Sequence, residues 1–294
     1  KSAYLMMIQS QFYLAKYGDA NRILSEMNNE LNDEVREETI FWTAMIKWKQ
    51  GKVQPAINDL TAILLNDMHI EMEAKVHMAI AEIYFDQQMK TQSMDYLEKA
   101  AEIIQDPIEK GQIYYRIADL SFSDEDYDRA LSAYQQVIKL SQTKKQIQEG
   151  HLRSVQIYRL QGQLDLATRT IKEMLLDENF STIYSDLELE LAKLYQHQGM
   201  YVEAKNRLES IVQDYQRTIA SAEAYYMLGQ LSINQDWDTE AALKQFEMVS
   251  KEHKQSLYAS SAKIRLKEIK AYQKIYSEYG PWMERVTQVD SMGN

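Results

Sequence analysis

Small side chains recur at a fixed interval along this chain, and that interval constrains its fold more than any other feature. Each step is 37 residues, apart from a first step of 36, and the positions are Ala20, Ala56, Ser93, Ala130, Ala167, Ala204 and Ala241. Twelve residues before them stand further small residues, namely Ala44, Ala81, Ala118, Val155, Ala192 and Gly229. Self-similarity at a period of roughly 20–50 residues is the signature of a solenoid.

The pattern inside each period predicts two antiparallel helices. Apolar residues recur at spacings of three and four, as in Leu191, Leu194 and Tyr195, which is the spacing of one helix face. Gly51, Gly162 and Gly199 then mark the turn between the helices, because a helix C-terminus favours a left-handed residue. The small side chains fall where the two paired backbones come closest.

The order of residue types in one period resembles the tetratricopeptide repeat. The matching residues are Ala192, Tyr195, Gly199, Tyr201, Ala204, Leu208 and Ile211. The resemblance covers residues 1–256 as seven repeats, at about 1–36, 37–73, 74–110, 111–147, 148–184, 185–221 and 222–256. It implies an all-α, right-handed α–α superhelix. Residues 257–294 are predicted to form a capping helix over 257–277 and a loosely ordered tail after Gly280-Pro281.

The period exceeds the family's usual repeat of about 34 residues, and the extra residues are predicted to lengthen the start of the first helix of each repeat. Residue types that favour helix N-caps stand just before those helices: Asn32, Asp106, Thr143, Ser181 and Thr218. Two of them begin capping boxes, Asp106 with Glu109 and Thr143 with Gln146.

Composition excludes several classes of partner. The formal net charge of −11 argues against nucleic acid and against an anionic membrane surface. Cysteine is absent, so thiol catalysis and disulfides are excluded. No stretch approaches the roughly 20 apolar residues of a membrane span, so direct membrane insertion is not expected. The chain begins with Lys1, which indicates that something upstream is missing, either a cleaved signal or lipoprotein peptide or an artificial boundary.

Enzyme motifs are missing as well. His69, Glu71, Glu73 and His77 are close in sequence, but a solvated connection between repeats explains them better than a metal site. Asp124, Asp126 and Asp128 alternate as in a calcium loop, yet Arg129 replaces the required glycine and Gln135 the required glutamate. We therefore expect a protein that is not an enzyme and has no metal or cofactor.

The family resemblance implies a concave groove lined by four positions on the first helix of each repeat. In the first four repeats these positions offer aromatic residues and methionines edged by acids, as adaptable binding surfaces do. The predicted groove residues are Phe12, Phe41, Met45, Trp48, Met78, Glu82, Phe85, Tyr115, Asp119 and Phe122. The alternative is that the longer helices bury this stripe in the core.

Two functions remain open. The first is an interaction scaffold that binds an apolar or basic peptide segment, or a partner's helix, in the groove; the family's basic clamp for a terminal carboxylate is absent. The second is a regulatory or sensor module of a larger signalling protein whose effector domain lies upstream. Segments beginning at Ile211 and Tyr258 resemble bacterial cell-envelope repeat proteins, which favours a periplasmic or envelope location over a cytoplasmic one. The oligomeric state is not indicated.

Overall fold

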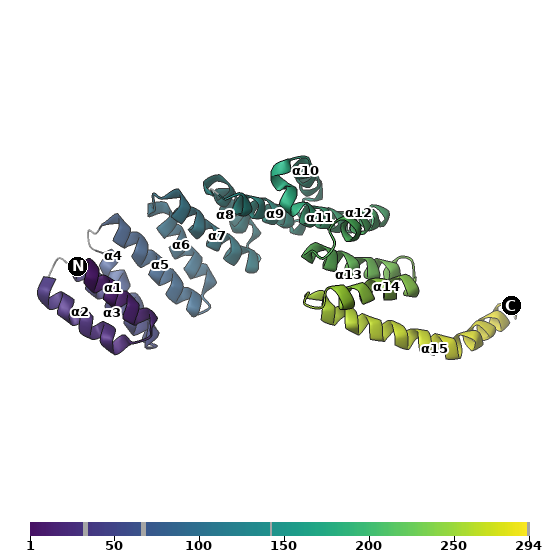
Figure 1. Ribbon diagram of the computed structural model, residues 1–294, viewed down its shortest axis with the longest axis horizontal. Coiled ribbons are helices and arrows are strands. Elements are labelled where there is room, and N and C mark those ends of the chain that lie inside the picture. Colours follow the sequence, from purple (N-terminus) through teal and green to yellow (C-terminus); the bar gives the residue numbers. More distant parts are fainter. Residues whose placement is uncertain (32–34, 66–68, 142, 293–294) are drawn as a thin grey trace. The chain divides into compact units, whose positions relative to one another are not determined.

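The computed structural model describes residues 1–31, 35–65, 69–141 and 143–292, with side chains through Tyr279 (Figure 1). The described residues form helices and connections and contain no strand, so the fold is all-α, as the sequence predicts. The chain divides into two compact units, Lys1–Ser154 and Val155–Asn294. The division at seven repeat boundaries stays a prediction.

The first unit is a succession of helices in which each contacts the next along the chain, up to α8. They are α1 (Ser2–Tyr13), α2 (Tyr17–Leu31), α3 (Arg36–Lys49), α4 (Val53–Leu64), α5 (Ile70–Asp86), α6 (Lys90–Ile103), α7 (Pro107–Ser123), α8 (Tyr127–Leu140) and the first part of α9 (Lys144–Leu160). Odd-numbered helices open each pair and even-numbered helices close it.

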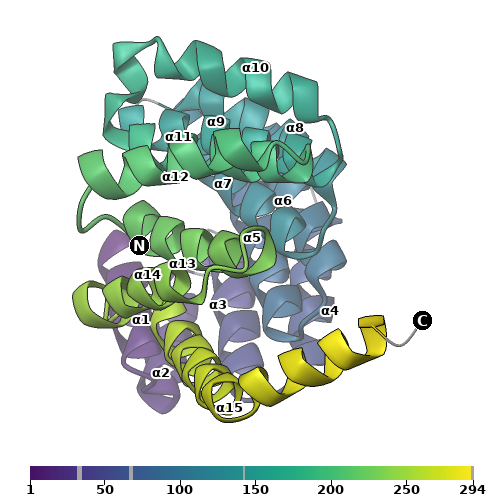
Figure 2. The same cartoon turned by 90° about the vertical axis from the view of Figure 1, so that its right-hand side faces the viewer.

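The second unit continues the same alternation after the rest of α9. It contains α10 (Leu164–Leu175), the short 3-10 helix η2 (Glu178–Ile183), α11 (Tyr184–His197), α12 (Tyr201–Asp214), α13 (Ile219–Asn234), α14 (Thr239–Glu252) and α15 (Tyr258–Met292). The pair α13–α14 packs against the first part of α15, which therefore covers the end of this unit (Figure 2).

The small residues lie at the contact between paired helices. Ala20, Ala56, Ser93, Ala130, Ala167 and Ala204 are fully buried, and the hydroxyl of Ser93 on α6 donates to the carbonyl oxygen of Ala81 on α5 at 2.8 Å. A larger side chain would separate the two backbones. In the last pair the buried residue is Ala242, as the match of this repeat to the family pattern predicts once one inserted turn residue is counted, whereas Ala241, at the strict 37-residue step, is half-buried.

A left-handed residue closes the turn inside every helix pair of the described chain. The predicted glycines Gly51, Gly162 and Gly199 have φ of 80°, 75° and 75°. The corresponding residues in the other pairs are Ala15, Gln88, Glu125 and Trp237, with φ of 58°, 60°, 61° and 54°. The turn geometry is thus conserved along the solenoid even where glycine, which adopts it without steric cost, is absent.

Most of the predicted helix starts are confirmed. The carboxylate of Asp106 accepts from the backbone N–H groups of Ile108 and Glu109, and Thr218 accepts from that of Ser221 at 3.0 Å. The hydroxyl oxygen of Thr143 accepts from the backbone N–H of Gln146 at 3.4 Å, as an N-cap does, and the hydroxyl donates to the Gln146 side-chain oxygen at 2.8 Å in place of the backbone contact of a capping box. The prediction of Ser181 as an N-cap is wrong, because Ser181 lies inside η2 and α11 starts only after Ile183. Asn32 lies outside the described residues.

The C-terminal helix is longer than the sequence predicts. α15 continues past Gly280-Pro281 to Met292, where a loosely ordered tail was expected. Proline fixes φ close to the helical value, so inside a helix it removes a hydrogen bond and clashes with the preceding turn but does not always end the helix. Ala262 and Ile269 are buried against α14, whereas Tyr272 is 42% exposed.

Candidate partner-binding surface

The ten predicted groove residues divide by burial. Phe12, Phe41 and Trp48 are buried, with only 6%, 3% and 8% of their surface exposed. The half-buried residues are Met45, Met78, Glu82, Tyr115 and Phe122, and the exposed ones are Phe85 and Asp119. The aromatic residues of the first two helix pairs are therefore buried, whereas the predicted residues of α5 and α7 are half-buried or exposed, and their role in binding stays a prediction.

Neighbouring side chains explain why the first aromatic residues are buried. The ring of Phe12 packs edge-on against Trp42, with centroids 5.5 Å apart. The ammonium of Lys75 lies 4.4 Å from the centroid of Phe41, and burial lowers the pKa of Lys75 although Glu38 opposes the shift. For these residues the alternative interpretation, a stripe buried in the core, describes the structure.

The surface of α5 and α7 retains accessible aromatic rings, and we call Met78, Phe85, Tyr115 and Phe122 the aromatic face. Phe85 is 37% exposed. A guanidinium lies above each phenylalanine: that of Arg116 is 5.3 Å from the centroid of Phe85, and that of Arg153 is 5.3 Å from the centroid of Phe122. Such cation–π contacts fix the rings while leaving part of each ring open.

The acids beside the aromatic face already have partners. Glu82 forms an ion pair with Arg116, and the carboxylate of Asp119 accepts a hydrogen bond from the hydroxyl of Tyr134 at 2.7 Å. The pKa of Tyr115 is raised by burial and by its hydrogen bond to Glu149. The surface is therefore less negative than the sequence suggests, and Asp119, which is exposed, is its most accessible carboxylate.

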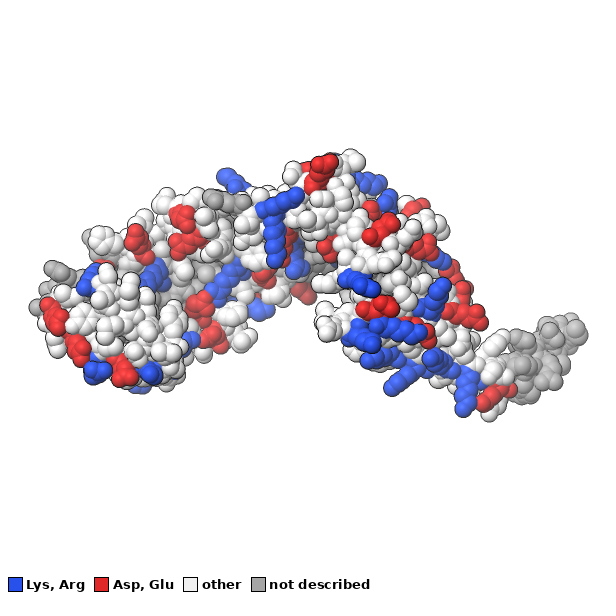
Figure 3. All heavy atoms as spheres, in the orientation of Figure 1, with Lys and Arg blue, Asp and Glu red and all other residues white. Residues whose placement is uncertain are grey.

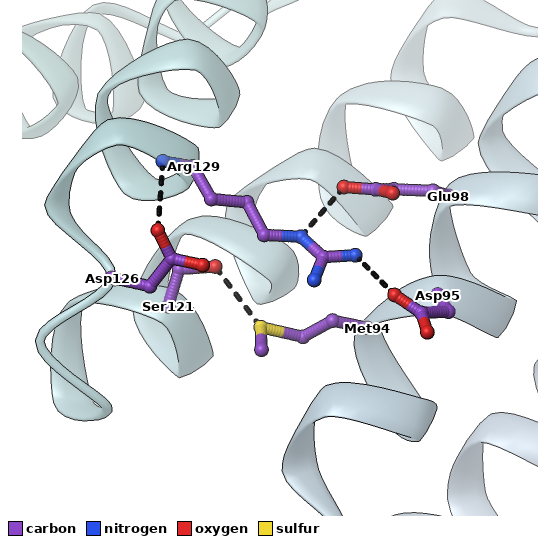
Figure 4. Close-up of polar contacts among 6 residues, drawn as sticks. All are labelled: Met94, Asp95, Glu98, Ser121, Asp126 and Arg129. Atoms are coloured by element: carbon purple, nitrogen blue, oxygen red, sulfur yellow. Dashed lines mark hydrogen bonds and ion pairs between the residues drawn. The ribbon is translucent and has the colours of Figure 1, made fainter.

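Ion pairs connect successive helix pairs, and Arg129 gives the most complete example (Figure 4). From α8, its guanidinium donates to Glu98 and to Asp95 of α6, each at 2.8 Å. Burial would lower the pKa of Arg129, but the hydrogen bonds to these two carboxylates raise it. Asp126 accepts from the backbone N–H of Arg129 at 3.3 Å and therefore caps the N-terminus of α8.

Sequence reasoning missed these links, although they leave a signal. Arg129 follows its partners by 31 and 34 residues, and Arg116 follows Phe85 by 31 and Glu82 by 34. Arg153 follows Phe122 by the same 31 residues. A search at those two separations, just below the 37-residue period, for arginine paired with an acid or an aromatic residue would have found them.

A second charged cluster lies in the second unit. Glu190 is only 2% exposed and accepts from Arg159 and Lys193 at 3.0 Å each, while Lys193 also contacts Glu223 at 2.8 Å. Burial, with Glu190 and Glu223 nearby, raises the pKa of Asp186 although Lys193 opposes the shift. The cluster joins α9, α11 and α13, so we interpret it as a structural link between helix pairs.

The part of the chain that the structure describes contains neither a metal-binding cluster nor a membrane-spanning helix. It contains no group of three or more side chains suited to hold a metal ion. No helix in this part has the length and hydropathy needed to cross a bilayer.

Stacked antiparallel helix pairs with small residues at their contacts define an α-solenoid, a class typical of protein–protein interaction scaffolds. A tetratricopeptide-repeat model matches residues 186–218, and a model of the soluble NSF attachment protein family matches residues 9–152. Together with the structural neighbours, which share the fold, these matches support a tetratricopeptide-repeat family assignment for the chain. No curated protein matches the sequence significantly.

Several solved structures share the fold at low sequence identity. The C-terminal part of a tetratricopeptide-repeat protein from Cytophaga hutchinsonii has a TM-score of 0.56 and 12% identity, covering 87% of this chain and 97% of that one. The Naa15/Naa10 complex bound to HypK-THB gives 0.59 and 15%, covering 97% of this chain but 42% of that one. The apo quorum sensor NprR from B. thuringiensis gives 0.53 and 14%, covering 94% and 81%.

Proposed function

We propose that this protein is a non-catalytic interaction scaffold that binds an apolar or basic peptide segment, or a partner's helix, on the aromatic face of α5 and α7. The observation that carries the proposal is a pair of phenylalanines, the exposed Phe85 and the half-buried Phe122, spaced by one period and each contacted by a guanidinium. Aromatic rings and methionine are enriched at protein interfaces. The resemblance to cell-envelope repeat proteins favours an envelope assembly as the setting.

The side chains of the aromatic face favour a ligand that is apolar or positively charged. Met78, Phe85 and Phe122 supply apolar area, and the exposed carboxylate of Asp119 favours a positive charge on the partner. The cations Arg116 and Arg153 are engaged with the rings, so they offer little to an acidic ligand. Phe12, Phe41 and Trp48 support the surface from the core and do not contact the partner.

The test compares synthetic peptides on wild-type protein and on the double variant Phe85→Ala/Phe122→Ala. Fluorescence anisotropy should show binding of apolar and basic peptides to the wild-type protein and a loss of at least about tenfold in the variant. The variant Tyr13→Ala/Trp237→Ala is the matched control, because it removes aromatic rings that are 79% and 68% exposed elsewhere. Unchanged affinity in the Phe85/Phe122 variant, with both variants folded, would refute the proposal.

A further inference from the structure

The second unit carries a surface of opposite charge to the rest of the chain. The formal net charge of the protein is −11, yet residues 254–275 contain six Lys or Arg and a single acid, Glu268. Figure 3 shows the corresponding side chains gathered over α14 and the first part of α15. Such local reversal of charge indicates a surface for an acidic partner, because complementary potentials steer and orient association.

The lysines on α15 form one straight row. Lys263, Lys267, Lys270 and Lys274 are separated by four, three and four residues, a spacing that places them on one face of the helix. All four are exposed, and the row is about 16 Å long at the rise of an α-helix. Within the described residues, only Lys270 has an ion-pair partner, Glu247 at 3.9 Å.

The row continues onto the neighbouring helix. Glu247 of α14 lies between Lys270 and Lys251, which it contacts at 3.0 Å, so the two helices bring their lysines to the same surface. Lys254, in the connection between the helices, is exposed as well. We call these six residues the lysine band; they are Lys251, Lys254, Lys263, Lys267, Lys270 and Lys274. Arg265 lies outside the band and pairs with Glu268 at 2.9 Å.

We propose that the lysine band binds an acidic α-helical segment of a partner protein. Neighbouring lysines in the row are about 5–6 Å apart, and glutamates at the same four-three-four spacing on a second helix would match them. The band is only about one helix spacing wide, roughly 8–10 Å. Glu252 and Glu278 flank its ends, so a broad anionic surface such as a DNA duplex or a bilayer would meet carboxylates as well.

The probe is a synthetic helical peptide with glutamates at four-three-four spacing, and its control has glutamine at the same positions. Fluorescence anisotropy should show binding of the glutamate peptide only. The affinity should fall steeply from about 0.01 M to about 0.15 M salt, where the Debye length shortens from about 30 to about 8 Å. Binding of the glutamine peptide with equal affinity, or an affinity independent of salt, would overturn the proposal.

Two matched variants locate the site. Lys263→Glu/Lys267→Glu/Lys270→Glu/Lys274→Glu should lose at least about tenfold in affinity, since each exposed charge pair changes affinity by a factor of about 1.5 to 5. Lys16→Glu/Lys52→Glu/Lys144→Glu/Lys145→Glu changes the net charge equally at exposed lysines of the first unit and should bind far better than the band variant. Circular dichroism establishes that both are folded, and a glutamine version of the band variant should show a smaller loss in the same direction.

Three results would overturn the proposal: equal binding by the band variant and wild type, equal loss in both charge-reversed variants, or binding of duplex DNA or phosphatidylserine vesicles without binding of the glutamate peptide. The test is independent of the aromatic face. The Phe85→Ala/Phe122→Ala variant should bind the glutamate peptide as wild type does, so failure of one proposal leaves the other standing.

Discussion

Replacing Gly162 by alanine should destabilise the protein through the backbone alone. Gly162 has φ of +75°, and a Cβ atom built there meets no other atom within 4 Å, so the substitution causes no steric clash with its surroundings. A left-handed conformation costs an L-residue about 1–2 kcal/mol. Alanine also lowers the conformational entropy of the unfolded chain, which stabilises the folded state by about 0.4–1 kcal/mol. We therefore expect a net loss of roughly 0.5–1.5 kcal/mol in the free energy of unfolding.

Gly18 supplies the matched control. It lies inside α2 without a positive φ, and a Cβ there also meets nothing within 4 Å. Gly18→Ala should therefore stabilise the protein by about 0.5–1 kcal/mol, because glycine is unfavourable inside a helix. Gln88 has φ of +60° in the corresponding turn of α5–α6, so Gln88→Gly should also stabilise.

Urea unfolding followed by far-UV circular dichroism measures all three variants against wild type. The prediction concerns signs: Gly162→Ala lowers the unfolding midpoint, whereas Gly18→Ala and Gln88→Gly raise it. If the two glycine-to-alanine changes shifted the midpoint in the same direction, the left-handed turn would not be the origin of the effect, and the reasoning would be refuted.

Gly229→Ala should cost about 1–3 kcal/mol, because a Cβ would lie 2.7 Å from two ring atoms of Phe246; a melting temperature equal to that of wild type would contradict this. Asp186→Asn should stabilise the protein at neutral pH, since the raised pKa of Asp186 means that its charged form is unfavourable in the folded state. That gain should diminish as the pH falls through the raised pKa and vanish below the ordinary value of 3.8, where wild type is protonated in both states; a gain that persists in acid would exclude the charge as its cause.

The helix pairing could be predicted because it depends on residues close in sequence. Ala81 and Ser93 are twelve residues apart and belong to one helix pair, so their contact follows from the local pattern and the turn. The period then places the same contact in every pair. In the last pair the strict period points to Ala241, and the buried position, Ala242, follows only when the residue inserted in the turn is counted.

The exposure of the aromatic residues could not be predicted in the same way. The ring of Phe41 on α3 is covered by Lys75, which lies 34 residues away. The ring of Phe85 on α5 contacts Arg116 instead and stays 37% exposed. Whether a ring is buried therefore depends on side chains from the following helix pair, for which the repeat pattern specifies no residue type. The lysine band went unnoticed for a related reason, because an overall charge of −11 conceals a basic segment near one end.

The regular spacing between aromatic rings and guanidinium groups allows the scaffold to change length by whole units. Gln88 and Glu125 occupy equivalent turns with φ of 60° and 61°. Excising residues 88–124 therefore puts Glu125 in the place of Gln88, with the same backbone conformation. Arg153 would then follow Phe85 by 31 residues and Glu82 by 34, the separations that Arg116 has now. Duplication of the same segment would preserve both separations, so whole-unit insertion or deletion keeps this contact between rings and guanidinium groups in register.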